Sequence, residues 1–119
     1  MRQRQGRERV GNVTEVGVSR LREWPENPRA ISASRLAALQ QAMTDDPEML
    51  WARPVIALLD GTVIAGNMRL RAGRELGWET IPTIYVDLSP DEARLWALRD
   101  NNQYGEWDEP ALSSKPISE

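Results

Sequence analysis

The stretch "DGTVIAGNMRLRAGRELGW", residues 60–78, decides the fold because it runs from a hairpin turn through a strand and a glycine into a helix. Asp60-Gly61 supplies the positive φ angles of a tight type I′ turn. The apolar, largely β-branched run 63–65 after it predicts a buried strand. Gly66 then separates this strand from a helix, which is the kind of junction found in α/β domains.

The helix predicted after Gly66 has one apolar side. Met68, Ala72 and Leu76 recur every four residues, the spacing that places side chains on one face of a helix. Gly77 follows at the C-cap, where a left-handed backbone conformation commonly ends a helix.

Strands and helices also alternate along the rest of the chain. Strands are expected within 13–21, 53–66 and 80–88, and helices are expected from Ser32 or Ser34 to Pro47 and from Ser89 onward. Ser89 and Glu92 form a capping box, and Leu95 and Leu98 make this last helix amphipathic. The order of strand, helix, hairpin, helix, strand and helix predicts an α/β (α+β) domain with a small mixed sheet and three main helices.

Composition excludes several classes of protein. The chain has 119 residues, the size of one domain, and contains neither cysteine nor histidine. Disulfides, thiolate chemistry, the commonest general base and the commonest metal ligand are therefore excluded. No apolar stretch is long enough to span a bilayer, and no secretory signal follows the N-terminal arginines. We therefore expect a cytoplasmic protein with no membrane partner.

Charge is distributed unevenly along the chain. Residues 2–9 carry four arginines and one glutamate, whereas the whole chain has a net charge of −3. We interpret residues 1–12 as a flexible basic arm, 13–108 as the folded domain and 109–119 as a disordered tail. A basic arm is able to touch phosphates, but a solubilising tail is the simpler interpretation.

The acidic stretch and the tryptophans in the middle of the chain receive structural interpretations. "TDDPE", residues 44–48, is interpreted as a solvated helix end rather than a metal cluster, because no further ligands lie near it in sequence. Trp51, Trp78 and Trp96 flank predicted strands or lie on the last helix, so we expect them in or beside the core.

The junction at Gly66 has the properties of an anion site. A helix start leaves several backbone N–H groups without intrahelical partners, and the helix dipole favours negative charge there. Gly66 has no Cβ and permits close approach. Arg69 and Arg71 add guanidinium groups, which match the geometry of phosphate. The alternative is an ordinary strand–helix junction with a solvated helix face.

A second polar cluster, "DNNQ" at residues 100–103, lies where the last helix is expected to finish. It has two interpretations. In the structural one, Asn101 or Asn102 takes a left-handed conformation and caps the helix before Gly105. In the functional one, Asp100 and Asn101 face a pocket and contact the phosphates of a nucleotide or an attached cation.

These stretches together resemble the N-terminal domain of ParB-type proteins, with the ParB/sulfiredoxin fold, over residues 14–108. The resemblance is nearest to phage or methyltransferase-linked members. The matching stretches are "NPR", "RPVIALLDGTVIAGNMRLRAGRELG", "IPTIYVDL" and "ALRDNNQYGEWD". Within them, "GNMRLRA" parallels the family's G-E-R-R-x-R-A box and "DNNQY" parallels E-N-x-Q-R.

The resemblance implies a bound nucleoside triphosphate, since members of this fold bind CTP or ATP. It implies that residues of both boxes, and one residue at the strand before them, contact CTP or ATP. It also implies that Asp100 contacts Mg²⁺. The implied nucleotide-binding residues are Arg53, Gly66, Asn67, Arg69, Arg71, Ala72, Asp100 and Asn101.

Departures from the family pattern limit what the resemblance implies. Met68 and Tyr104 stand where partition proteins have arginines, so positive charge is lost at both boxes. Sulfiredoxin chemistry is excluded because it needs a cysteine. Partition proteins read DNA through a following helix-turn-helix domain, so we expect DNA to be reached through a partner or a missing domain. The chain is either a fragment of a longer protein or a small protein that depends on a partner.

Three function classes follow from these expectations. The first is a nucleotide-binding regulatory module in a DNA-associated context such as partition, modification or phage regulation. The second is an enzyme of the same fold, a small nuclease, NTPase or phosphotransferase, although only Asp100 offers itself as a base. The third is a ligand-free protein-interaction domain. The sequence leaves open whether the chain forms a homodimer.

Overall fold

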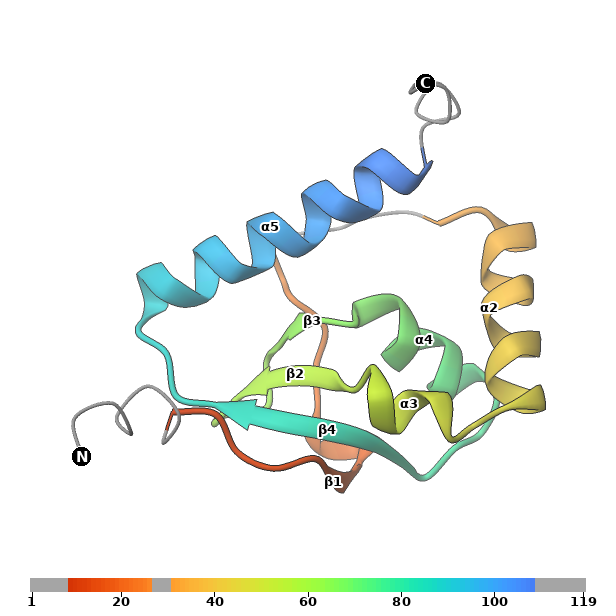
Figure 1. Cartoon of the computed structure of the whole chain (residues 1–119), viewed down its shortest axis with the longest axis horizontal. Helices are drawn as coiled ribbons and strands as arrows, with labels where there is room; N and C mark the ends of the chain where they lie inside the picture. Colours follow the sequence, from red (N-terminus) through yellow and green to blue (C-terminus); the bar gives the residue numbers. More distant parts are fainter. Residues whose placement is uncertain (1–8, 27–30, 109–119) are drawn as a thin grey trace.

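The computed structural model describes residues 9–26 and 31–108, and for 101–108 it describes the backbone alone. Four strands and four α-helices follow one another with one short 3₁₀ helix (Figure 1). They are β1 (Thr14–Gly17), η1 (Val18–Arg20), α2 (Ala33–Asp45), α3 (Met49–Ala52), β2 (Val55–Leu58), β3 (Val63–Ala65), α4 (Asn67–Glu75), β4 (Thr80–Val86) and α5 (Pro90–Asp108).

The strands form one mixed sheet in the order β1-β4-β2-β3. β2 runs parallel to β4, whereas β1 pairs antiparallel with β4 and β3 pairs antiparallel with β2. The parallel pair needs a crossover, and α4 provides it between β3 and β4. The predicted α/β class, small mixed sheet and three main helices (α2, α4 and α5) are confirmed.

Helices cover both faces of the sheet (Figure 1). Successive residues of β2 point to opposite faces, so Val55 and Ala57 join the core under α2, α3 and α4, whereas Ile56 and Leu58 pack with α5. The first core also holds Met43, Leu50 and Leu70, and the second is closed by Ala93 and Ala97. Each face of the sheet therefore has its own apolar core.

The hairpin turn differs from the predicted type I′ form. The Gly61 N–H donates to the Leu58 carbonyl, and the Leu58 N–H donates to the Thr62 carbonyl, both at 2.8 Å. Three residues therefore lie between the paired strands, and Gly61, with φ 95°, takes the left-handed position that closes such loops. Asp60 stabilises this longer loop because its carboxylate accepts the Thr62 N–H at 2.9 Å.

Helix α4 ends as predicted but buries a different set of side chains. Gly77 has φ 84°, its N–H donates to the Arg74 carbonyl, and the Trp78 N–H donates to the Gly73 carbonyl. These bonds form the Schellman motif. Met68 and Ala72 are buried as expected, but Leu76 is exposed and Leu70 is buried instead.

Helix α5 begins as predicted and extends further than expected. The Glu92 N–H donates to Ser89 Oγ and the Ser89 N–H donates to Glu92 Oε1, which is the expected capping box. The helix continues to Asp108, so "DNNQ" lies inside it and the predicted left-handed cap at Asn101 or Asn102 is wrong.

Two short elements depart from the sequence-based expectation. The first strand ends at Gly17 and is followed by η1, and the one-turn helix α3 was not predicted. The described end of the N-terminal segment is attached to β4: Val10 bridges Val86, and Arg9 and Asp87 are joined by a backbone hydrogen bond of 2.8 Å. Residues 9–11 therefore form part of the folded domain.

Candidate functional site

The start of α4 presents its backbone at a glycine with a left-handed conformation. Gly66 is the N-cap, with φ 89° and ψ 23°, and no side chain caps the helix. The first intrahelical bond runs from the Leu70 N–H to the Gly66 carbonyl, so the N–H groups of residues 67–69 have no acceptor within the helix. N–H groups at a helix start favour an anion, and the sequence predicts an anion site at this junction.

Arg69 lies against this helix start. A Cβ placed on Gly66 would come within 2.9 Å of Arg69 Nη2 and 3.2 Å of Val55 Cα. Arg69 Nη2 also donates to the Pro54 carbonyl at 3.3 Å. The guanidinium is thus held between the Gly66 backbone and the beginning of β2, where it adds positive charge to the helix N-terminus.

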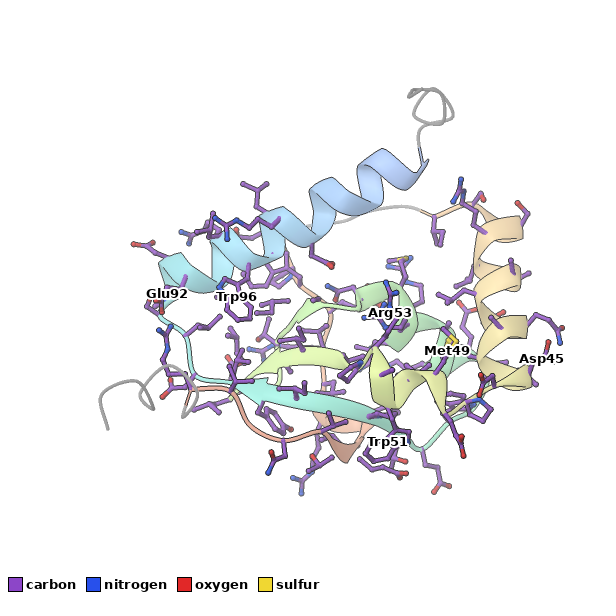
Figure 2. The ribbon with its side chains drawn as sticks, in the orientation of Figure 1. Asp45, Met49, Trp51, Arg53, Glu92 and Trp96 are labelled. Atoms are coloured by element: carbon purple, nitrogen blue, oxygen red, sulfur yellow. The ribbon has the colours of Figure 1, made fainter. Side chains whose placement is uncertain are left out.

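Arg53 lies near the start of α4 because of its position in the chain. It precedes Pro54, whose carbonyl accepts from Arg69, and it is exposed at the C-terminal end of α3. Figure 2 shows the Arg53 side chain extending from the end of α3 on the side where α4 lies. The α3–β2 junction therefore brings a second arginine near the start of α4.

The side chain of Asn67 is engaged inside the protein. Its Oδ1 accepts the Trp24 N–H at 2.9 Å, and its Nδ2 donates to the Val63 carbonyl at 3.2 Å. Asn67 is buried. Its side chain thus fastens the segment before residue 27 to the strand–helix junction, and only its backbone remains for a ligand.

Arg71 points to a carboxylate that the sequence did not identify. Its Nη2 lies 2.7 Å from Glu23 Oε1 and its Nε lies 3.4 Å from Oε2, a bidentate pair in which each side chain is 32% exposed. The hydrogen bonds that Glu23 accepts from Arg71 raise the pKa of the Arg71 guanidinium above its ordinary value. The predicted pair of phosphate-facing arginines is therefore reduced to Arg69, with Arg71 held by Glu23.

A hollow of about 240 Å³ opens beside the junction. Asp100 of α5 and Ala65 of β3 both line it, together with Ile56, Trp96 and Arg99. Ala65 immediately precedes Gly66, so the hollow brings Asp100 to the strand that leads into the first box, although no residue of that box lines it. Figure 2 shows Trp96 on the side of α5 that faces the sheet.

The remaining predicted residues are placed as follows. Ala72 is fully buried in the core under α4 and contributes packing. Asn101 lies in α5 directly after Asp100, and its side chain is outside the described part of the structure, as is the "NPR" stretch at residues 27–29 that contributed to the resemblance.

Trp96 and Arg99 are lining residues that sequence reasoning missed. Trp96 is four positions before Asp100, the spacing that places two residues on one face of a helix. That spacing could have identified Trp96 as a neighbour of Asp100 in the hollow. We interpreted Trp96 instead as part of the apolar face of an amphipathic helix.

A magnesium ion at Asp100 would need oxygens from elsewhere. Among the side chains that the structure describes, no three or more carboxylates gather as a metal site. Mg²⁺ commonly uses one or two carboxylates and completes its shell with water and substrate phosphates. The single carboxylate of Asp100 at the hollow is compatible with that pattern only if substrate phosphates and water supply the other oxygens.

These features define a class of small α/β domain in which a strand leads through a left-handed glycine into a helix, and in which this strand and a C-terminal helix line a hollow. The chain belongs to the family of the ParB N-terminal domain, whose model matches residues 2–102.

A sequence relative supports the family assignment. The chain is 31% identical over 100 residues to the probable chromosome-partitioning protein ParB of Helicobacter pylori. That match covers 81% of this chain and 33% of the relative, so the chain spans about a third of the relative's length.

Solved structures share the fold at low identity. ParB from Caulobacter crescentus, C-terminally truncated and complexed with CTP-γ-S, superposes with a TM-score of 0.67 and 18% identity over 88% of this chain and 64% of that one. The same protein complexed to the centromeric parS site gives 0.62 and 21% over 76% and 47%. A Pnob8-like ParB-N domain gives 0.60 and 20% over 82% and 38%.

Within the described part of the chain, every helix is too short or too polar to cross a lipid bilayer.

Proposed function

We propose that this chain binds a nucleoside triphosphate, CTP or ATP with Mg²⁺, and acts as a nucleotide-dependent module in a DNA-associated context such as partition, modification or phage regulation. One observation carries the proposal: Asp100 of α5 lines the same hollow as Ala65, which leads into the Gly66 helix start. The α4 helix start lies one residue beyond Ala65, so a cation held by Asp100 and phosphates held at the helix start would belong to one ligand.

The phosphates belong at the start of α4. The Arg69 guanidinium lies where a Cβ on Gly66 would be, so a phosphate oxygen would bind against that guanidinium and accept from the N–H groups of residues 67–69. Arg69 adds a charge-assisted contact from beside the glycine. Arg53 supplies a second guanidinium by a small movement of an exposed side chain.

Asp100 belongs to the metal side of the ligand. Its carboxylate would hold Mg²⁺ against the phosphates, with Asn101 next to it on α5. The hollow of about 240 Å³ is smaller than typical ligand pockets of roughly 300–1,000 Å³. It therefore encloses part of the nucleotide while the remainder lies along the surface of α4.

Arg71 and Ala72 take part less directly. Arg71 would reach a phosphate only by exchanging Glu23 for it, so its contribution is smaller than that of Arg69. Ala72 keeps α4 close to the sheet and thereby fixes the direction of the helix start.

Structures of a relative with bound ligands support this proposal. One Caulobacter crescentus structure was solved with CTP-γ-S and another with parS DNA. For this chain, DNA would be reached through a partner or through a segment outside it, and nucleotide binding would control that association. A homodimer closing over the nucleotide is part of the same proposal.

Titration calorimetry with CTP, ATP and GTP in the presence of Mg²⁺ tests the proposal. We expect one of the first two to bind, and we expect Arg69→Ala and Asp100→Ala to weaken binding by at least tenfold, because each removes a charged contact worth about 1.5–3 kcal/mol. Arg94→Ala and Asp91→Ala are matched controls, since both residues are exposed on α5 away from the hollow.

The outcomes separate the three function classes. Binding without turnover, lost in Arg69→Ala and kept in Arg94→Ala, supports the regulatory module. Release of phosphate or cleavage of nucleic acid would instead identify an enzyme. If none of the three nucleotides binds, or if the four variants bind equally, the proposal is wrong and a ligand-free interaction domain remains.

A further inference from the structure

A groove lies at the end of the molecule where β1 and β4 meet α3. Its volume is about 430 Å³, and it is lined by Glu15, Pro47, Trp51, Trp78, Glu79 and Pro82. These residues come from the β1 edge of the sheet and its surroundings, whereas the nucleotide hollow includes Ala65 of β3 at the opposite edge. We call this surface the Trp51 groove.

The walls of the Trp51 groove are aromatic and rigid. Trp78 packs against the core beneath α4, so its ring is fixed from behind. Trp51, which we expected in or beside the core, is 44% exposed and so does not lie inside the core. Figure 2 shows it extending from α3 away from α4. Two prolines with these tryptophans give an apolar surface of low conformational entropy, of the kind that binds extended peptide segments.

The rim of the Trp51 groove is acidic. Glu15 and Glu79 are exposed carboxylates, and Thr80 Oγ1 donates to Glu15 Oε1 at 2.7 Å and holds it in place. Asp46 and Glu48 flank Pro47, so the "TDDPE" stretch adds negative charge beside the groove. Within the described residues, no arginine or lysine lines it.

We infer that the Trp51 groove binds an extended, arginine-bearing segment of a partner protein, ideally one that contains proline. A guanidinium is attracted both to the faces of indole rings and to carboxylates, and this groove combines two indoles with uncompensated negative charge. Proline-rich segments dock against aromatic surfaces because they are already extended. The inference is independent of the proposed nucleotide site.

A nuclear magnetic resonance titration of the full chain tests the inference. The probe is a ten-residue peptide of alternating proline and arginine, and the readout is the indole N–H signal of each tryptophan. We expect the Trp51 and Trp78 signals to shift in a saturable way and the Trp24 and Trp96 signals to stay in place. The neutral control peptide has citrulline in place of arginine and should bind at least about fivefold more weakly.

Variants locate the binding surface. Trp51→Ala and Glu79→Gln should each weaken the peptide by about threefold or more. Asp91→Asn, which removes one charge from α5 outside the groove, should change it little. Glu79 is exposed, so Glu79→Gln keeps the fold even if Trp51→Ala does not.

Several outcomes would overturn the inference. Equal weakening by Asp91→Asn would mean that only the overall charge of the protein attracts the peptide. Equal binding of the citrulline peptide would show that the groove selects apolar chains without cations. Shifts of Trp51 that depend on protein concentration without peptide would assign the groove to a second copy of this chain.

Discussion

Gly66 and Gly77 share a backbone conformation and differ in their surroundings. Their φ angles are 89° and 84°, so alanine is strained by roughly 1–2 kcal/mol at either position. A Cβ at Gly66 would meet Arg69 Nη2 at 2.9 Å and Val55 Cα at 3.2 Å, whereas nothing lies within 4 Å of a Cβ at Gly77. Substitution of Gly77 therefore tests backbone strain alone, whereas substitution of Gly66 tests the same strain together with a change at the helix start.

We predict that Gly66→Ala abolishes nucleotide binding, because the methyl group displaces Arg69 from its place beside the helix start. Gly77→Ala should lower stability by a similar amount of backbone strain and leave nucleotide affinity within about twofold. Calorimetric titration and thermal unfolding of both variants provide the measurements. Equal nucleotide affinity in the two variants would show that Gly66 serves only the turn.

The side chain of Asn67 gives a second prediction at this scale. Asn67→Ala should lower the free energy of unfolding by about 2 kcal/mol, because the Trp24 N–H and the Val63 carbonyl lose their partner in a buried place. Urea denaturation measures the loss. A change smaller than roughly 0.5 kcal/mol, the level typical of surface substitutions, would mean that water replaces the amide and that Asn67 is not a fastening point.

Residue types at the junction were predictable, and their partners were not. Gly66, Arg69 and Asp100 were identified from local chemistry: a glycine before a helix, a guanidinium in its first turn and a carboxylate beside amides. Arg71 was assigned to phosphate by the same logic. Its partner Glu23 is 48 positions away, and only the folded chain brings the two together.

Helix α5 shows which features of an element can be read from sequence. Its capping box was predicted correctly because the four residues involved are neighbours in the chain. The buried face was not: Ala93 and Ala97 face the sheet, and Leu95 and Leu98 are exposed. Small residues let α5 lie close to β3. A hydrophobicity pattern does not reveal that the alanines, rather than the larger leucines, form the buried face.

We predict that Ser89→Ala lowers stability by about 1 kcal/mol, the usual contribution of an N-cap hydroxyl. Ser89→Asp should retain most of that stability, because a carboxylate also accepts the Glu92 N–H. Thermal unfolding of the two variants measures the difference. An equal loss of stability in the two variants would show that the N-cap hydrogen bond is not the cause.

At the scale of the whole molecule, acid sensitivity follows from two carboxylates at the same end of the sheet. The Thr62 N–H lowers the pKa of Asp60, and the Ser89 N–H together with Arg9 lowers the pKa of Glu92. Arg9 Nη2 lies 2.5 Å from Glu92 Oε1 and links the N-terminal segment to α5. Both carboxylates are thus favoured in their charged form by the fold.

A folded pKa below the unfolded value gives stability that is present above the unfolded pKa and lost as pH falls through the folded one. The ordinary values are 3.8 for Asp60 and 4.5 for Glu92. We therefore predict that these two groups leave the melting temperature unchanged near neutral pH and lower it below about pH 4. Glu92→Gln should flatten that decline, whereas Asp91→Asn should not. An unchanged acid slope in Glu92→Gln would contradict the assignment.

The architecture as a whole places α4 and α5 on opposite faces of the sheet, with α5 packed against β3 and α4 beginning directly after that strand. The order of elements predicted the sheet and its helices, because strand and helix periodicities are local. It did not predict that α5 would run on past Asp100 as helix and carry this carboxylate to the junction. The candidate nucleotide site depends on that convergence.

The most direct test is a titration of the isotope-labelled chain with CTP, and separately with ATP, in the presence of Mg²⁺. The readout is the backbone amide signal of each residue. We predict saturable shifts that are largest for residues 66–69 and for Asp100, and that disappear in Asp100→Ala while the rest of the spectrum keeps its folded dispersion. Shifts confined to other surfaces, or none at millimolar nucleotide, would contradict the assignment of a nucleotide to the start of α4.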